Sequence, residues 1–153
     1  MARLDRMSPQ EREHYLNTPC PTFDKMSWVL GPPLKQQKIA LISTAGLQRR
    51  GDRPFSQGAV DYRLIPADTP STELVMSHIS TNFDRTGFQQ DWNVVFPLDR
   101  LRELAEAGDI GSVAQYHYSF MGATDPEMMA PRARELGQIM RMEGVDAVLL
   151  IPV

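Results

Sequence analysis

Small and polar residues stand at the ends of two apolar runs, and they are the first candidates for chemistry. Thr44 and Gly46 follow the run 39–42, where small residues and backbone N–H groups can receive an anion. A tight turn explains the same residues equally well, and the sequence lacks the G-x-G-x-x-G pattern of a dinucleotide site. His78 lies near the end of the run 74–79. It could orient a substrate carboxylate or transfer a proton, or it could cap the strand through backbone hydrogen bonds.

Loop charges and a second polar cluster complete the candidates. Asp84 and Arg85 lie in the loop after His78 and could bind an ammonium or a carboxylate, although loop charges are mostly just solvated. His117 and Tyr118 lie near the end of a third segment, where Tyr118 could supply a proton or form the aromatic edge of the core. The predicted substrate-binding residues are Thr44, Gly46, His78, Asp84, Arg85, His117 and Tyr118.

The sequence gives less support for metal binding or for thiol chemistry. His14, His78 and His117 have no metal-ligand spacing, so no metal site is predicted. Cys20 is the single cysteine, which permits no internal disulfide. It lies between two prolines with nothing nearby to lower its pKa, so a structural or incidental role is favoured over a reactive one. No catalytic residue is therefore identified within the chain.

Composition narrows the class of protein. A chain of 153 residues with 42% hydrophobic residues can build one domain around one core. The net charge of −3 offers no positive excess to hold a phosphate backbone, which argues against a nucleic-acid partner. The runs 39–42 and 147–151 are too short to cross a bilayer, and residues 1–6 are charged rather than signal-like. We expect a cytoplasmic protein that binds neither nucleic acid nor membrane.

The elements that must position the candidates begin after a proline-rich arm. Residues 1–36 contain a short helix at 9–17, and we expect Phe23 and Trp28 to anchor this arm on the domain or on a partner. Residues 37–153 alternate apolar strands with amphipathic helices, which favours a Rossmann-like α/β fold: a mainly parallel sheet with helices on both faces. Ligands of such sheets bind at the carboxyl ends of the strands, where the candidates should converge.

The individual elements follow from periodicity and from helix caps. Helices are predicted at 98–107 and 127–143, with Pro131 either kinking the second helix or delaying its start. Residues 93–97 could form a short strand or an extended lead-in to the first helix. Strands of the parallel sheet are predicted at 38–43, 74–79, 113–120 and 147–151, with an edge strand at 62–66.

Three stretches resemble a known family. They are KIALISTAG (38–46), then SH (77–78) with NFD (82–84), NVVFPLDRLREL (93–104) and GDIG (108–111), and finally HYSFMG (117–122) with GVDAVLL (144–150). Together they resemble the selenoprotein B subunits of the glycine, sarcosine, betaine and D-proline reductases, over about residues 38–153. The middle stretch is the most specific, because many α/β proteins have runs like the first and the last.

The resemblance implies a reductase whose reactive loop, opening with selenocysteine or cysteine, comes directly after Val153. The domain would then be truncated after a central strand, through a UGA codon taken as a stop, an engineered truncation or a natural split. In the glycine and D-proline reductases of this family, the chalcogenolate cleaves the C–N bond of a substrate whose amine is held by a pyruvoyl group on a partner subunit. A selenol suits this role because it is more acidic than a thiol, whose pKa is about 8.5.

Two functions of different class remain open. The first is a component of a selenol- or thiol-dependent reductase that cleaves a C–N bond of a small amino acid or amine. It would carry no cofactor within this chain, form a homo-oligomer and need a pyruvoyl-bearing partner subunit. The second is a non-catalytic interaction protein that lacks the redox loop and binds through the arm and the sheet edge. A racemase-like protein with two thiols is disfavoured, because the chain has one cysteine.

Overall fold

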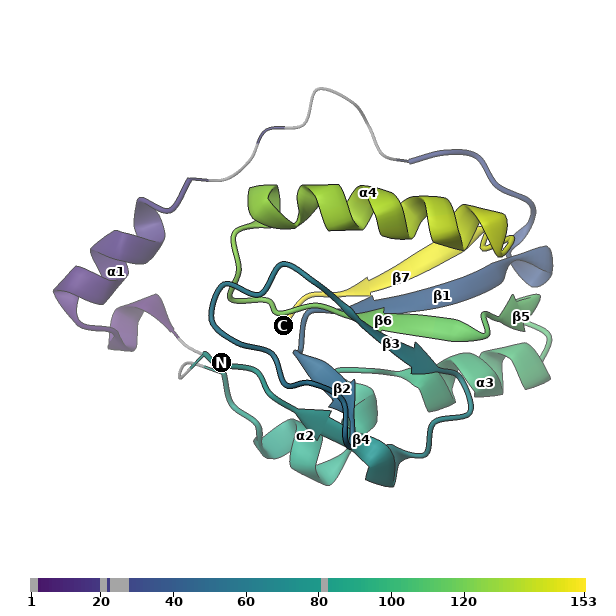
Figure 1. Ribbon diagram of the computed structural model, residues 1–153, viewed down its shortest axis with the longest axis horizontal. Coiled ribbons are helices and arrows are strands. Elements are labelled where there is room, and N and C mark those ends of the chain that lie inside the picture. Colours follow the sequence, from purple (N-terminus) through teal and green to yellow (C-terminus); the bar gives the residue numbers. More distant parts are fainter. Residues whose placement is uncertain (1–2, 20–21, 23–27, 81–82) are drawn as a thin grey trace.

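The computed structural model describes the arm in parts and the α/β region almost completely (Figure 1). Cys20 and Phe23 fall outside the described residues, so the predictions for them stay untested. The described residues are 3–19, 22, 28–80 and 83–153.

The larger sheet is curled and mostly parallel, and β1 (Lys38–Ser43) is its centre. β1 pairs in parallel with β7 (Ala147–Ile151) on one side, and with β5 (Ser112–Val113) and β6 (Tyr116–Ser119) on the other. The apolar run 39–42 suits this place, because both faces of a central parallel strand are buried. β3 (Arg63–Pro66) pairs antiparallel with β6, which confirms the predicted edge strand with its terminal proline.

The predicted strand 113–120 is wrong as one continuous element. It is split into β5 and β6, because the ladder with β1 is interrupted by a side chain. The backbone N–H of Leu41 donates to Nδ1 of His117 at 3.0 Å instead of to a carbonyl of the neighbouring strand. Periodicity alone does not reveal such a substitution of side chain for backbone.

The predicted strand 74–79 is shorter and lies in a different sheet. β4 (Leu74–Met76) pairs antiparallel with β2 (Leu47–Arg49) in a separate two-stranded sheet. β2 was not among the predicted strands. The short apolar run at 74–79 therefore does not belong to the parallel sheet, because local antiparallel pairing satisfies its backbone.

Two long helices cover opposite faces of the larger sheet (Figure 1). α3 (Leu98–Glu106) packs Leu98 and Leu101 against the β1 face that carries Leu41. α4 (Pro126–Met142) packs Leu136 against the other face, beneath which Tyr118 lies. Both predicted helices are confirmed, and α4 begins before Pro131, capped by Asp125. The architecture is mixed α/β, while a Rossmann-like arrangement stays a prediction.

Several short helical segments connect the strands and the two long helices. The segment at 93–97 does not form a strand, because the Asp91 side chain accepts the N–H of Asn93 at 2.9 Å and so starts a turn. The short elements are η2 (Leu34–Gln36), η3 (Ser71–Glu73), α2 (Thr86–Gln90) and η4 (Trp92–Val94).

The arm contains η1 (Leu4–Arg6) and α1 (Pro9–Leu16), neither of which has a buried residue. α1 confirms the predicted helix and starts with a capping box in which Ser8 and Glu11 bond each other's backbone N–H. Trp28 does not anchor the arm on the domain, since its side chain is 82% exposed, while anchoring on a partner stays a prediction. The division into arm and domain at residue 36 stays a prediction.

Among the described residues β7 lies at an edge of the sheet, so the expectation of a truncated central strand stays a prediction. Among these residues β7 pairs with β1 alone. Its side chains Leu149 and Leu150 are 38% and 65% exposed, although we expected Leu149 to be buried. No described strand pairs with the other edge of β7, so this apolar strand has an open edge.

Candidate functional site

The carboxyl ends of β1, β6 and β7 meet at one side of the larger sheet, because these strands run parallel (Figure 1). Backbone hydrogen bonds continue past the strands and hold the ends together. The N–H of Thr44 donates to the carbonyl of Ile151 at 3.1 Å, and the N–H of Gly122 donates to the carbonyl of Thr44 at 2.8 Å. The N–H of Gly46 donates to the carbonyl of Phe120 at 2.9 Å. We refer to this region as the strand-end cluster.

Gly46 brings the end of β4 to the same cluster, although β4 belongs to the other sheet. Its φ of +65° lies in the left-handed region, where side chains are disfavoured. A β-carbon at this position would lie 3.1 Å from the backbone N and Cα of His78. The carbonyl of Gly46 accepts the N–H of Ser77 at 2.9 Å. Thr44, Gly46 and His78 are thus brought together, as the sequence predicted, although by a different topology.

His78 is a buried, neutral hydrogen-bond donor. The residue is 5% exposed, and its Nδ1 accepts the backbone N–H of Ser80 at 3.2 Å. The ring proton therefore sits on Nε2, which has no hydrogen-bond partner among the described residues. Burial, and then the nearby guanidinium of Arg85, hold the pKa of His78 below its usual 6.5. At neutral pH the imidazole offers an uncommitted N–H.

Of the two loop charges, Arg85 reaches the cluster and Asp84 serves the start of a helix. Arg85 Nη2 donates to the carbonyl of His78. Asp84 Oδ1 accepts the backbone N–H of Thr86 at 2.9 Å, where α2 begins. Hydrogen bonds from Thr86 lower the pKa of the Asp84 carboxyl, which is exposed and charged.

His117 and Tyr118 do not join the cluster. His117 is fully buried on the α3 side, edge-on to Phe96 at 6.1 Å between ring centres, and burial followed by the charge of Arg102 lowers its pKa to about 4. Tyr118 points to the opposite face, where its hydroxyl lies 3.4 Å from Glu143 Oε2 and burial raises its pKa. Neighbouring residues of a strand face opposite sides, so the two cannot act together at one site.

Buried hydroxyl groups around the cluster were missed by the sequence analysis. Ser119 Oγ accepts the N–H of Leu47 at 2.8 Å, and Ser77 Oγ donates to Gln48 Oε1 at 2.7 Å. Ser43 Oγ accepts the N–H of Ala45 at 3.2 Å. The bonds of Ser119 and Ser43 satisfy backbone groups where the chain turns away from the strands, and the bond of Ser77 joins two side chains. A usable signal was present, because all three apolar runs end near a serine.

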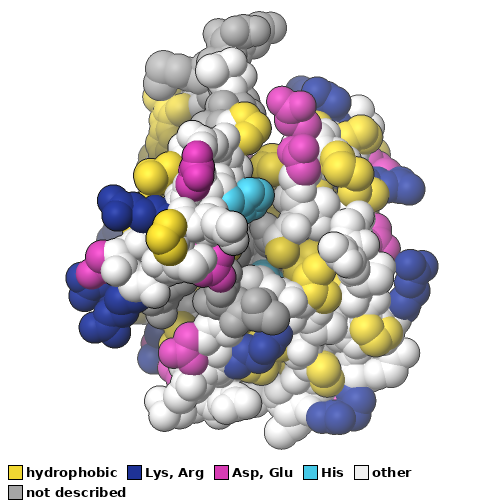
Figure 2. Space-filling view, turned by 90° about the vertical axis from the view of Figure 1, so that its left-hand side faces the viewer, with side chains coloured by type: hydrophobic (Ala, Val, Ile, Leu, Met, Phe, Trp, Pro, Cys, Tyr) yellow, Lys and Arg dark blue, Asp and Glu magenta, His cyan; other side chains and the backbone are white. Residues whose placement is uncertain are grey.

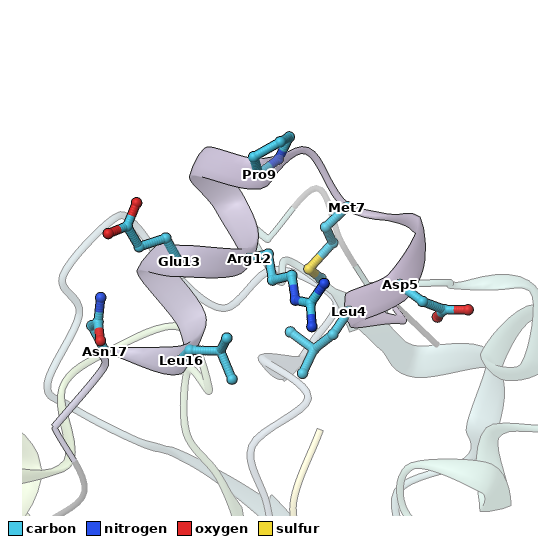
Figure 3. Close-up of a pocket in the computed structure, with 8 residues that line it drawn as sticks. All are labelled: Leu4, Asp5, Met7, Pro9, Arg12, Glu13, Leu16 and Asn17. Atoms are coloured by element: carbon cyan, nitrogen blue, oxygen red, sulfur yellow. The ribbon is translucent and has the colours of Figure 1, made fainter.

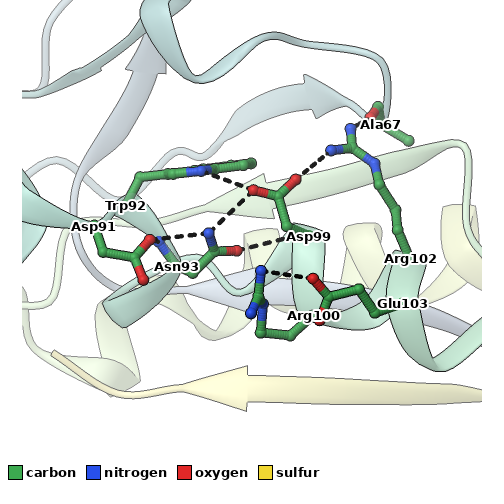
Figure 4. A network of polar contacts seen from close by, with 8 residues as sticks. All are labelled: Ala67, Asp91, Trp92, Asn93, Asp99, Arg100, Arg102 and Glu103. Atoms are coloured by element: carbon green, nitrogen blue, oxygen red, sulfur yellow. Dashed lines mark hydrogen bonds and ion pairs between the residues drawn. The ribbon is translucent and has the colours of Figure 1, made fainter.

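The polar residues of the segment 91–102 form a structural corner (Figure 4). Asp99 accepts hydrogen bonds from Trp92 Nε1 and Asn93 Nδ2, each at 3.0 Å, and from Arg102 Nη1 at 2.6 Å. Arg102 also donates to the carbonyl of Ala67, which ties α3 to the loop after β3. The most specific stretch of the family resemblance therefore specifies this corner, since its polar groups bind one another.

Two hollows lie elsewhere on the molecule. One, of about 430 Å³, opens between η1 and α1 in the arm (Figure 3) and is lined by Leu4, Met7 and Leu16 together with charged neighbours. The other, of about 340 Å³, lies beside β2 and η3, where Arg49 and Glu73 contribute opposite charges. Neither hollow includes a residue of the strand-end cluster, so neither is assigned to the site.

The face toward which the strands end carries charges of both signs with scattered hydrophobic side chains (Figure 2). Neither positive nor negative charge dominates this face, whereas a polyanion partner would require a predominantly positive surface. In the described part of the chain, no three His, Cys, Asp or Glu side chains gather to hold a metal ion. No helix among the described residues is long and apolar enough to span a membrane.

Comparison with known proteins agrees with the family resemblance. Residues 6–152 match the family described as glycine/sarcosine/betaine reductase selenoprotein B. The chain is 32% identical to the D-proline reductase subunit gamma of Acetoanaerobium sticklandii over 120 residues, which cover 76% of this chain and 49% of that protein. It is 30% identical to the betaine reductase complex component B subunit beta of Peptoclostridium acidaminophilum, covering 96% of this chain and 35% of that protein.

A third relative is the glycine reductase complex component B subunit gamma of Symbiobacterium thermophilum, 30% identical over 140 residues. That alignment covers 86% of this chain and 32% of the relative. The chain thus spans between about a third and a half of the length of these relatives. No solved structure gives a significant match.

Proposed function

Because the chain belongs to the glycine/sarcosine/betaine reductase selenoprotein B family, we propose that it forms the N-terminal scaffold of a subunit in an amino-acid reductase complex. The proposed reaction is the selenol- or thiol-dependent reductive cleavage of a C–N bond in a small amino acid or amine. The named relatives are components of D-proline, betaine and glycine reductases, which supports this substrate class.

One observation carries the proposal: the strand-end cluster includes the end of β7. Thr44 bonds the backbone of both Ile151 and Val153, while Gly46 and His78 lie on its other side. We propose that the reactive selenocysteine or cysteine follows Val153. A nucleophile there would stand at the carboxyl edge of a parallel sheet, which is where such sheets bind ligands.

The described residues suit an amino-acid substrate. The neutral Nε2–H of His78 and the guanidinium of Arg85 are proposed to bind its carboxylate, and the exposed charge of Asp84 to lie near the positive charge on its nitrogen. His117 and Tyr118 are not proposed as contacts, because His117 faces α3 and Tyr118 faces α4, away from the strand-end cluster. A pyruvoyl group on a partner subunit would bind the substrate amine and draw electrons from the C–N bond.

The bond changes balance with two electrons from a dithiol. The chalcogenolate attacks the carbon, the C–N bond breaks, and nitrogen leaves with the bonding pair and takes up a proton. A thiolate then attacks the chalcogen, and the carbon leaves with its bonding pair and is protonated. The resulting chalcogen–sulfur bond is reduced by a dithiol, which becomes a disulfide.

The test is to express the longer gene with cysteine at the codon after Val153 and to supply the partner subunits. Dithiol-dependent cleavage of D-proline, glycine, sarcosine or betaine is expected, and serine at the same codon should abolish it. His78→Phe should raise KM for the cleaved substrate by about tenfold or more, since a hydrogen bond to a charged group contributes about 1.5–3 kcal/mol. If that codon encodes neither cysteine nor selenocysteine, the reductase proposal fails.

A second candidate is an interaction protein on the same fold, and the exposed apolar side chains favour it. Leu150 on β7 is 65% exposed, and Trp28 and Leu30 in the arm are 82% and 98% exposed. These side chains would bind a protein partner without any chemistry. This function takes the place of the first if the extended protein carries no reactive thiol or selenol.

A further inference from the structure

Thr44 and Gly122 enclose the last residue of the segment that follows β7. We propose that they are positioning residues, which fix the direction in which the chain leaves β7 and thereby the place of the reactive residue relative to His78. The inference rests on the function proposed above for its final step. Its geometric part stands on the described residues alone.

The Thr44 side chain replaces a missing backbone bond. In a regular parallel ladder, the N–H of Val153 would donate to the carbonyl of Thr44, because Thr44 lies one residue beyond the pair Ser43 and Ile151. That carbonyl instead accepts the N–H of Gly122 from the opposite side, at 2.8 Å. The hydroxyl takes over, and Val153 N–H donates to Thr44 Oγ1 at 2.8 Å.

The same hydroxyl also donates. Thr44 Oγ1 lies 3.2 Å from the carbonyl oxygen of Val153, so its proton and one lone pair both serve the backbone of one residue. The N–H of Thr44 bonds the carbonyl of Ile151 at 3.1 Å. Pro152, between these two bonded residues, has no N–H and a restricted φ. The path of residues 151–153 is therefore fixed by one threonine and one proline.

Gly122, which follows β6, lies close to the backbone of both Val153 and Thr44. A β-carbon on it would lie 2.5 Å from the carbonyl oxygen of Val153 and 2.9 Å from that of Thr44. The Thr44 oxygen lies within the chain and accepts the N–H of Gly122, so it cannot swing aside as a flexible side chain would. Glycine is required here for close approach of three strand ends.

Such an arrangement matters for a nucleophile, because reacting atoms must be held within a fraction of an ångström of the productive geometry. The residue after Val153 takes its position from the Val153 carbonyl, which Thr44 holds. A loosened end would leave the scaffold folded and the nucleophile misplaced. Effects on turnover should thus exceed effects on stability.

The first test uses the 153-residue chain and amide hydrogen exchange. Thr44→Val removes the hydroxyl at nearly equal volume, and the Val153 amide should exchange about tenfold faster, as expected for one lost hydrogen bond. Thr44→Ser keeps the hydroxyl and should restore slow exchange. Equal exchange in the wild type and the valine variant would overturn the geometric part, provided that both melt cooperatively.

The second test uses the extended protein with its reactive cysteine. Thr44→Val is expected to lower kcat about a hundredfold with little change in KM, because misplacement by about 1 Å has an effect of that order. Thr44→Ser should restore kcat, and Gly122→Ala should behave like the valine variant. Unchanged kcat in Thr44→Val overturns the positioning role. If the wild-type extended protein is itself inactive, the proposed function fails, while the exchange experiment still decides the geometry.

Discussion

At the strand ends, single side chains make hydrogen bonds that backbone groups would otherwise make. This explains which features the residue patterns could predict and which they could not. Thr44, Gly46 and His78 could be chosen from the sequence because each follows an apolar run. The role of His117 could not, because its Nδ1 bonds the N–H of Leu41 inside the sheet, far along the chain. Hydrogen bonds between a strand backbone and a distant side chain leave no periodic signal.

His117 makes stability depend on pH. Its pKa is lowered from 6.5 to about 4 in the folded chain, so between these values the unfolded chain binds more protons than the folded one. The stabilisation is fully present above pH 6.5 and decreases as pH falls toward 4. Over this window the free energy of unfolding should drop by about 3 kcal/mol from this group.

Urea denaturation of His117→Asn measures that contribution. The asparagine oxygen can replace Nδ1 as the acceptor for Leu41 N–H, while the variant does not titrate. Its free energy of unfolding should vary less between pH 4 and 6.5 than that of the wild type. His14→Asn, on the exposed face of α1, is the matched control. Parallel pH profiles for His117→Asn and the wild type would contradict the assignment.

At the scale of elements, helices with a clear apolar face were predictable, and the pairing of short strands was not. α3 and α4 follow from periodicity and caps. The run at 74–79 was long enough to suggest a core strand, but β4 pairs with β2, which is three residues long. Pairing between such short segments depends on the conformation of the turn at Gly46, which the sequence alone does not determine.

The corner around Asp99 should contribute more to stability than its exposed neighbours. Asp99→Ala leaves the donors of Trp92 and Asn93 without their acceptor and should lower the free energy of unfolding by about 1–3 kcal/mol. Glu103→Ala, which removes an exposed ion pair with Arg100 of 2.7 Å, should lower it by less than about 1 kcal/mol. Chemical denaturation of both variants tests this, and equal losses would contradict the structural role of the corner.

The open edge of β7 should make this chain self-associate. Leu149 and Leu150 are exposed beside unpaired backbone groups, and such an edge pairs with another strand. Analytical ultracentrifugation should show dimers or larger species whose share rises with concentration. Leu150→Lys should reduce association, whereas Val94→Lys, at a side chain 61% exposed near α3, should not. A clean monomer at high micromolar concentration would argue against this use of the edge.

For the whole molecule, the sequence allowed the α/β class and the family to be predicted, because both depend on many residues at once. The family assignment rests on residues 6–152, and the mostly parallel sheet contains the predicted strands 38–43 and 147–151 and, in two pieces, 113–120. The order of the strands was not predictable, since it depends on contacts between segments distant in sequence. Exposure of Trp28 was missed for the same reason.

The central claim is that the end of β7 presents a reactive chalcogen to a substrate bound at the strand-end cluster. The most direct measurement is a single turnover of the extended protein with its partner subunits, without external dithiol and with any resolving cysteines replaced by serine. Peptide mass spectrometry should then find the substrate carbon skeleton attached to the residue after Val153. Cys20 should stay unmodified. An adduct on Cys20, or none on the residue after Val153 while substrate is consumed, would contradict the account.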